Sequence, residues 1–244
     1  MKRFSLYQEL RIKDFMGSAE LDIHHRQLVI FSNIITYGNA ANPEITASIR
    51  EEIETMWNEP TASLKFDSLW FEVRFKIHAW HNPSIDPFDI YRNLDPKNNY
   101  FRIEEYSHNH ISFVDGLNCN SGYFKLENLY KGSTTAAHEY GHTIGLNHPK
   151  NMDIRGEGVP GIMYPRGTLV DSQFQYDPAK PAGVTGGTMH PMYRKVKLED
   201  IEGLKLNRLE FHHGKAILGE FTNVWHEDHA KVRPEDFFGE IIEE

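Results

Sequence analysis

The sequence predicts an α+β fold, because strand-like and helix-like periodicities both occur in a chain of ordinary globular composition. Apolar and polar residues alternate over 70–80, as in a half-buried strand. Apolar residues recur at helical spacing over 43–57. Three short strand candidates, at 100–106, 109–114 and 121–126, precede a second helical segment. A chain of 244 residues is long enough for one domain with appendages.

The N-terminal part divides into an arm, a strand and a helix. Residues 1–26 have weak periodicity and are expected to form a surface arm. An apolar run from Leu28 to Tyr37 predicts the first strand. Asn42 and Pro43 then provide an N-cap and a proline at the first helical position, so the helix over 43–57 has a defined start.

The middle of the chain is expected to place a second helix after a loop and the short strands. Residues 81–99 contain three prolines and predict a loop. Ser133 and Thr134 are suitable caps for a helix that runs to about Leu146.

The C-terminal part is expected to be irregular before a final helix. Residues 149–193 are rich in Gly and Pro, and loops of this length usually have a function. A helix is predicted over 197–209, and its apolar side comprises Leu198, Ile201, Leu204 and Leu206. The main domain is therefore expected to span 27–210, with an acidic-ended extension at 211–244 that packs on it.

Composition and charge exclude several classes of partner. The net charge of −9, without a Lys/Arg-dense stretch, argues against nucleic acid as a partner. The longest near-apolar run, Leu28 to Ile35, is too short to span a bilayer, so no membrane partner is expected. Residues 1–14 lack the apolar stretch of a secretory signal. Cys119 is the only cysteine, so no internal disulfide is expected. We expect a monomer that is cytoplasmic, or exported by a route without such a signal, unless a signal has already been removed.

The most informative segment runs from His138 to His148. On a helix, His138 and His142 lie one turn apart and can present their imidazoles to one metal ion. Gly145 follows where the helix must end, because glycine adopts the left-handed conformation of such a stop. The reversal of the chain then brings His148 in as a third ligand.

Three imidazoles favour a single catalytic zinc ion, because they leave a fourth position open for water. Zinc makes that water acidic, and Glu139, next to the first ligand, is placed to accept its proton as the general base. A structural zinc site would need a fourth protein ligand and would have no use for Glu139.

This segment resembles the long zinc signature of the metzincin clan of metallopeptidases. Residues 161–165, with Met163, are similar to the Met-turn of the clan in its matrixin version, whereas Pro149 is more similar to serralysins. The resemblance implies a twisted, mostly parallel sheet of about five strands with one antiparallel edge strand, an active-site helix, the Met-turn and a C-terminal helix. It also implies a zinc endopeptidase that acts on a peptide or protein substrate.

The resemblance further implies where the substrate lies. The edge strand along the cleft is expected at 109–114, with His110, Ser112 and Val114 on one face. Tyr164 follows the Met-turn methionine and is a candidate to hydrogen-bond an oxyanion, and the chain after the Met-turn is expected to form the wall of the pocket.

Other readings of single residues stay open at this point. His108 and His110 share a face of a strand, as in the second, structural metal site of matrixins, but solvent-facing histidines are the simpler reading and a second metal is not expected. Cys119 could act as a cysteine switch, although a buried or loop thiol is the default. A carboxylate of the arm, Asp14 or Asp22, could block the metal instead.

Two alternatives to a general endopeptidase also stay open. Residues 166–171 and 187–191 are loosely similar to metallopeptidase domains of bacterial polymorphic toxins, which would imply an effector protease with a narrow protein target. The other alternative is an inactive zinc-containing binding module, which the presence of Glu139 disfavours.

Overall fold

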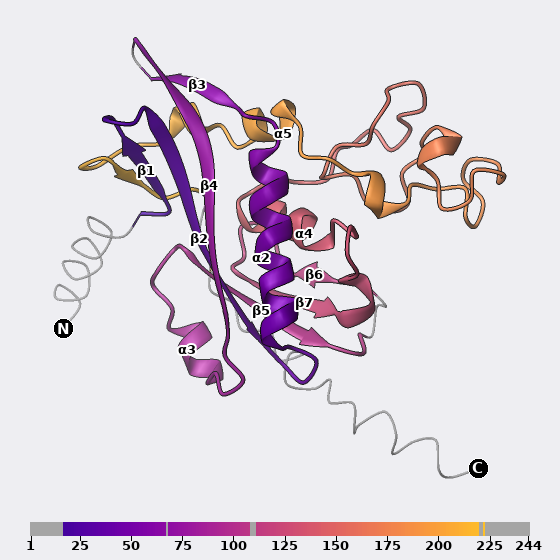
Figure 1. The fold of residues 1–244 in the computed structure, drawn as a ribbon, viewed down its shortest axis with the longest axis horizontal. Coiled ribbons are helices and arrows are strands. Elements are labelled where there is room, and N and C mark those ends of the chain that lie inside the picture. The colour runs from indigo at the N-terminus through magenta and orange to yellow at the C-terminus, as the bar shows by residue number, and fades with distance from the viewer. Residues whose placement is uncertain (1–16, 67, 108–110, 220–221, 223–244) are drawn as a thin grey trace.

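The computed structural model describes residues 17–66, 68–107, 111–219 and 222. The described part contains a mixed α+β fold built on one curled sheet (Figure 1). Across the sheet the strands are β3 (Ser63–Phe66), β4 (Leu69–His81), β2 (Gln27–Tyr37), β5 (Asn98–Glu104), β7 (Ser121–Lys125) and β6 (Phe113–Val114). The four central strands, β4, β2, β5 and β7, are parallel, and β3 and β6 are antiparallel edges. The expectation of an α+β fold with a mostly parallel sheet is confirmed.

The expected number of about five strands is too low, because the described part of the sheet has eight. Strand β3 precedes β4 in an antiparallel hairpin. Strand β1 (Ala19–Asp22) pairs with both β2 and β8 (Lys215–Ala216). Strands β1 and β8 come from the segments expected as arm and extension, and four and two residues are too few to produce a visible alternation.

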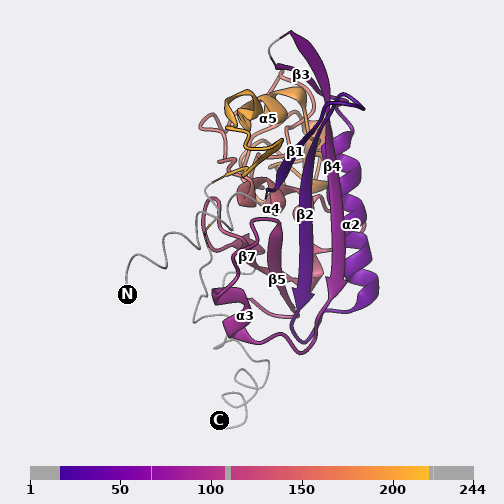
Figure 2. The same ribbon diagram turned by 90° about the vertical axis from the view of Figure 1, so that its left-hand side faces the viewer.

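Two helices pack on the same face of the sheet. Helix α2 (Pro43–Asn58) begins where Asn42 accepts a hydrogen bond from the backbone N–H of Ile45 at 2.9 Å, as the cap prediction requires. Its buried side chains Ile49, Ile53 and Trp57 pack against β4 and against helix α4 (Thr135–Thr143). Figure 2 shows α2 along one side of the sheet and the short helix α3 (Pro87–Tyr91) on the other.

The loop prediction for 81–99 is wrong at α3. The side chain of Asp86 accepts from the N–H of Phe88 at 2.8 Å, and Pro87 stands in the first turn, so two local signals start a helix of five residues. Such a helix is too short for apolar periodicity to reveal it, although buried Ile90 anchors it against β2 and β5.

The final helix is also shorter than predicted. Helix α5 (Leu198–Gly203) ends before Lys205, whose φ of 52° is left-handed, and a 3₁₀ turn (Leu206–Arg208) follows. Leu198 is 51% exposed and not part of the apolar side, whereas Ile201, Leu204 and Leu206 are buried as expected.

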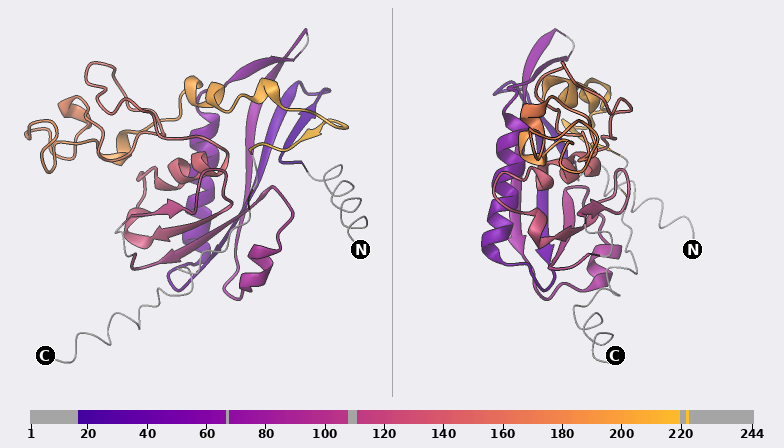
Figure 3. Two further views of the ribbon diagram at one scale, coloured as in Figure 1. Left: turned by 180° about the vertical axis from the view of Figure 1, so that it is seen from behind. Right: turned by 90° about the vertical axis from the view of Figure 1, so that its right-hand side faces the viewer.

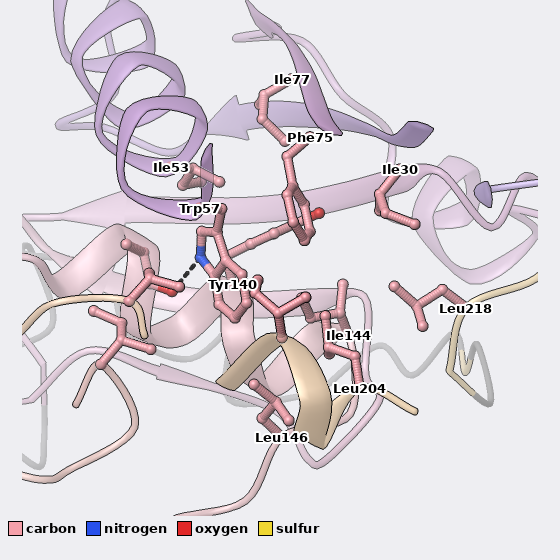
Figure 4. Close-up of a cluster of buried hydrophobic side chains, with 14 of the residues drawn as sticks. Ile30, Ile53, Trp57, Phe75, Ile77, Tyr140, Ile144, Leu146, Leu204 and Leu218 are labelled. Carbon is pink, nitrogen blue, oxygen red and sulfur yellow. Dashed lines mark hydrogen bonds between the residues drawn. The ribbon is translucent and has the colours of Figure 1, made fainter. Parts of the chain in front are cut away.

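The core lies between the sheet, α2 and α4 (Figure 4). Trp57 Nε1 donates to the carbonyl of Ala137 at 3.1 Å, which joins α2 to α4. The hydroxyl of Tyr140 lies 2.8 Å from Ser32 Oγ, which joins α4 to β2. The Trp57 and Tyr140 side chains are buried, so these hydrogen bonds fix the position of α4 relative to α2 and the sheet.

The segment 149–193 is irregular, as predicted, apart from 3₁₀ turns at Ser172–Phe174 and Pro191–Tyr193. It has a small core of its own, formed by Ile154, Val170 and Met189. Figure 3 shows it beside α4 and α5, at the end of the molecule away from α3. Among the described residues, no helix combines the length and apolarity that crossing a membrane requires.

We expect Tyr140→Phe to lower the free energy of unfolding by about 1–2 kcal/mol, because Ser32 Oγ loses its buried partner. Ser32→Ala should cost a similar amount. The double variant should cost less than the sum of the two by about 0.5 kcal/mol or more. Urea unfolding of the four proteins measures this coupling, and strict additivity would contradict the bond.

Candidate metal centre

Helix α4 positions the first two histidines. His138 and His142 are one turn apart, and their ring centroids are separated by 4.9 Å with the planes at 89°. His138 is buried, and His142 is partly exposed towards a cleft.

The end of α4 turns the chain so that the third histidine reaches the same point. Gly145 has a φ of 102°. Its N–H donates to the carbonyl of His142 at 3.1 Å, and the N–H of Leu146 donates to the carbonyl of Gly141 at 2.9 Å. This pair of bonds is a Schellman motif with glycine at its left-handed position, as the sequence predicts. His148 follows three residues after Gly145.

The three imidazoles converge through their Nε2 atoms. His148 Nε2 lies 3.1 Å from His138 Nε2 and 3.1 Å from His142 Nε2. Among the described residues, these three histidines form the one group of at least three metal-binding side chains (His, Cys, Asp or Glu) that could hold a metal ion. Their ligand atoms all lie within 4.8 Å of one another. The expectation that they lie together is confirmed.

Backbone carbonyls determine which nitrogen of two of the rings faces the centre. His138 Nδ1 is 2.7 Å from the carbonyl of Ile162, and His142 Nδ1 is 2.6 Å from the carbonyl of Leu146. A carbonyl can only accept, so Nδ1 carries the proton and the Nε2 lone pair points inward. Converging lone pairs repel each other unless a cation lies between them, so this donor set fits a metal ion.

Burial supports the neutral form of the same rings. It lowers the pKa of His142 to about 4 and the pKa of His138 well below its ordinary value, and the nearby Arg194 charge acts in the same direction. The pKa of half-exposed His148 is also lowered by burial. Neutral imidazole is the form that binds metals such as zinc, copper, nickel and iron.

The turn that contains Met163 lies against α4. It provides the Ile162 carbonyl to His138, and Met163 is only 3% exposed. A Cβ at Gly141 would collide with Sδ of Met163 and lie 3.2 Å from Trp57 Cζ2. Glycine at position 141 therefore allows the methionine turn to approach the helix that carries the histidines.

Glu139 lies beside the histidines and is 7% exposed. Burial raises the pKa of its carboxyl to about 8, against the positive charge of Arg194 and a hydrogen bond from the N–H of Val114 in β6. The edge strand therefore contacts the carboxyl group directly.

Arg194 was not predicted from the sequence. The residue is 4% exposed, and its guanidinium donates from Nε to Thr134 Oγ1 at 2.9 Å and from Nη1 to the Tyr164 carbonyl at 3.2 Å. Burial lowers the pKa of Arg194 to about 10, so it is charged at neutral pH. A single arginine in an irregular segment gives no sequence signal, and only the fold brings it to the histidines.

Glu52 was also missed. Its Oε1 accepts from the backbone N–H of Ala137 at 3.1 Å, so a side chain of α2 caps the first turn of α4. A signal did exist, because Glu52 stands seven residues after Ile45 on the apolar face of α2. A carboxylate on an apolar helix face indicates a buried partner.

The centre opens onto a cleft of about 520 Å³. The residues that line it include Ser112 and Val114, from the edge of the sheet, and Pro165 and Arg166, where the chain leaves the methionine turn. Ser112 Oγ already accepts a hydrogen bond from the N–H of Lys125 at 3.1 Å.

Of the two other residues named for the cleft, one lies elsewhere and one falls outside the described residues. The ring of Tyr164 packs against the small core of the irregular segment and is not among the residues that line the cleft. His110, like His108, lies outside the described residues. Of the expected edge strand over 109–114, the described residues 111–114 form a strand at Phe113–Val114, and it does lie at the edge of the sheet.

The alternative metal-blocking residues are engaged elsewhere or cannot be placed. Cys119 is buried, and its Sγ lies 3.4 Å from Ser121 Oγ. Asp22 accepts hydrogen bonds from His25 on the surface hairpin between β1 and β2. Asp14 lies outside the described residues.

A scan of the sequence against protein-family models gives no match, and a search of curated proteins finds no similar protein. Function is therefore inferred from the chemistry of the site itself.

We expect the purified chain to bind one zinc ion, which a chelator removes. Because burial lowers the pKa of the three imidazoles, protons should compete weakly above pH 6.5 and increasingly as the pH falls towards 4, the value for His142. Zinc affinity measured by competition with a chelator from pH 8 to pH 4.5 tests this. Affinity that is constant across this range would contradict it.

We expect Gly145→Ala to lower the free energy of unfolding by about 1–2 kcal/mol, the cost of a left-handed conformation for a residue with a Cβ. The new Cβ would also lie 2.8 Å from Asn118 Oδ1, so His148 should move and zinc affinity should fall. The control is Gly167→Ala, where a Cβ meets nothing within 4 Å and stability should change by less than about 0.5 kcal/mol. Equal effects of the two variants would contradict the role given to Gly145.

Proposed function

We propose that the chain is a zinc-dependent endopeptidase of the metzincin type. The observation that carries this proposal is the convergence of three Nε2 atoms beside a buried glutamate, at the base of a cleft that an edge strand borders. Three neutral imidazoles with one side open suit a catalytic zinc site better than a structural one, which normally has four protein ligands.

His138, His142 and His148 would hold the ion. When bound, zinc supplies the Lewis acidity that makes water a nucleophile at neutral pH and a carbonyl electrophilic. Glu139 acts as the general base, accepting a proton from water and delivering it to the leaving amine. The N–H of Val114 holds the Glu139 carboxyl in place, and Ile162 and Leu146 fix the tautomers of two ligands through their carbonyls.

The edge of the sheet favours an extended peptide as the substrate. Within the described part of the chain, strand β6 pairs with β7 alone, so no strand covers its other edge beside the cleft, where the N–H of Val114 already bonds the Glu139 carboxyl. An extended chain can add to such an edge as a further strand, which uses backbone groups and therefore tolerates many sequences.

The wider fold is compatible with the metzincin assignment. Five neighbouring strands, β4, β2, β5, β7 and β6, have the mostly parallel order with one antiparallel edge that the family resemblance implies. Met163 lies in a tight turn against the histidine helix, as a Met-turn would. These features support the proposal, although strands β1, β3 and β8 extend the sheet beyond it.

An effector protease with a narrow target would use the same chemistry on one substrate. An inactive binding module would bind zinc and a partner without hydrolysis. A general endopeptidase should cleave many members of a broad peptide library, whereas an effector protease with a narrow target should cleave few. A Glu139 variant should lose activity in either protease, whereas an inactive binding module has no activity to lose.

We expect Glu139→Gln to retain fold and zinc but to lose about 10²–10⁴-fold in cleavage rate, because the amide cannot accept the proton. His142→Ala should lose zinc as well as activity, because it removes a ligand. Cleavage of a peptide library, with zinc content by elemental analysis, measures both effects.

The matched control is Glu202→Gln on the exposed surface of α5, which should keep zinc content and rate. Full activity of Glu139→Gln would show that the assigned base is wrong. A zinc-loaded wild type that hydrolyses no peptide or denatured protein would overturn the endopeptidase proposal.

A further inference from the structure

The residues that line the cleft include a buried cation with no carboxylate in contact with it among the described residues. Arg194 is 4% exposed and lines the cleft together with the histidines. Its two hydrogen bonds go to neutral oxygens, the Thr134 hydroxyl and the Tyr164 carbonyl. Within the described part of the chain, no carboxylate lies in ion-pair contact with its guanidinium. The charges of Glu139 and Glu52 favour the charged guanidinium but do not contact it, so a buried cation that lines a cleft indicates a ligand of opposite charge that does.

A second, independent observation is the hydroxyl of Thr135. This residue is 4% exposed, lines the same cleft, and has no hydrogen-bond partner for Oγ1. Buried hydroxyls are normally satisfied, so an enclosed, unpaired hydroxyl on a residue that lines a cleft points to a polar group of a ligand as its partner.

Arg166 makes the same cleft more positive. It is half-buried, lines the cleft, and donates from Nη2 to the neutral Asn128 Oδ1 at 2.7 Å. The charge of Arg166 disfavours the charged form of Arg194, so the two guanidinium groups repel each other. An anion bound between the two guanidinium groups would attract both and offset their mutual repulsion. Such a pair is notable in a chain with a net charge of −9.

We propose that Arg194, Arg166 and Thr135 form a carboxylate-binding subsite beside the metal centre, which selects substrates with an acidic group next to the scissile bond. Arginine matches a carboxylate with two parallel N–H donors, and the threonine hydroxyl provides a further donor. This inference rests on the proposed endopeptidase function, because it assigns the substrate class of the same cleft.

The backbone at the start of α4 does not form the subsite. Glu52 already accepts from the N–H of Ala137, so a carboxylate of the chain itself occupies the N-terminal end of this helix. The anion must therefore be held by side chains of the cleft wall.

A carboxylate can come from an Asp or Glu side chain within a peptide or from the C-terminus of a peptide. The test uses matched fluorogenic peptides that differ only by Glu or Gln next to the cleaved bond, each with a free or an amidated C-terminus. We expect the Glu peptide to have a kcat/KM at least tenfold above the Gln peptide. If a free C-terminus gives this gain instead, the carboxylate is terminal and the subsite stands.

The variants are Arg166→Gln, Thr135→Val and Arg194→Gln. Each should reduce the Glu-to-Gln ratio of kcat/KM by about tenfold or more. Arg194→Gln also loses two hydrogen bonds within the protein and could fail to fold for that reason. Arg166→Gln and Thr135→Val then still test the subsite. The control is Arg208→Gln, an exposed arginine outside the cleft, which should keep the ratio of the wild type. Equal loss for Glu and Gln peptides would overturn the subsite and assign these residues to catalysis or folding.

Binding separates this inference from the proposed function. Zinc-loaded Glu139→Gln should bind the Glu peptide at least tenfold more tightly than the Gln peptide by calorimetry, and Arg166→Gln in that background should remove the difference. Preferential binding of carboxylates by a chain that cleaves nothing would overturn the endopeptidase and keep the subsite. Cleavage without any carboxylate preference, in rate or in binding, would overturn the subsite and keep the endopeptidase.

Discussion

The convergence of three imidazole nitrogens within 4.8 Å is the arrangement on which the functional architecture depends. Two of the rings are fixed by carbonyls that accept from Nδ1, one in the methionine turn and one just after the helix. The third arrives through a helix stop that only glycine adopts without strain. The site is therefore arranged by backbone geometry, and a cation between the rings relieves the repulsion of the lone pairs.

Helix α4 can hold this arrangement because it is fixed from several sides. Two residues of α2 bind the backbone of Ala137 in its first turn: Trp57 donates to the carbonyl, and Glu52 accepts from the N–H. Tyr140 binds β2 through Ser32, and Met163 packs against Gly141. A nine-residue helix is too short to be stable alone in water, so its geometry is a property of the core around it.

The charges of the centre form a second level of organisation. A buried glutamate and a buried arginine both border the cleft, each with its charge disfavoured by burial. They are not in ion-pair contact within the described structure, so each keeps hydrogen-bonding capacity towards the cleft. Each group favours the charged form of the other without contacting it, and buried ionisable groups with shifted pKa values at a cleft are typical of functional sites.

The sequence by itself determined what depends on neighbours along the chain. The spacing of His138, His142 and Gly145 specified a helix, its glycine stop and the histidine cluster, and Asn42 with Pro43 specified the start of α2. The alternation of apolar and polar residues in β4 and the apolar run in β2 were visible because both strands are long enough to show a pattern. The short elements α3, β1 and β8 left no period to detect.

Tertiary structure alone decided which distant residues meet. The hydrogen bonds of Glu52 to Ala137 and of Arg194 to Thr134 span 85 and 60 residues of the sequence, and Arg166 reaches the cleft from the irregular segment. An arginine in an irregular segment has no periodicity, and its role depends on the burial and the neighbours that the folded core gives it. Local spacing therefore predicts a metal centre, whereas the charged wall that faces its substrate cleft exists only in the folded chain.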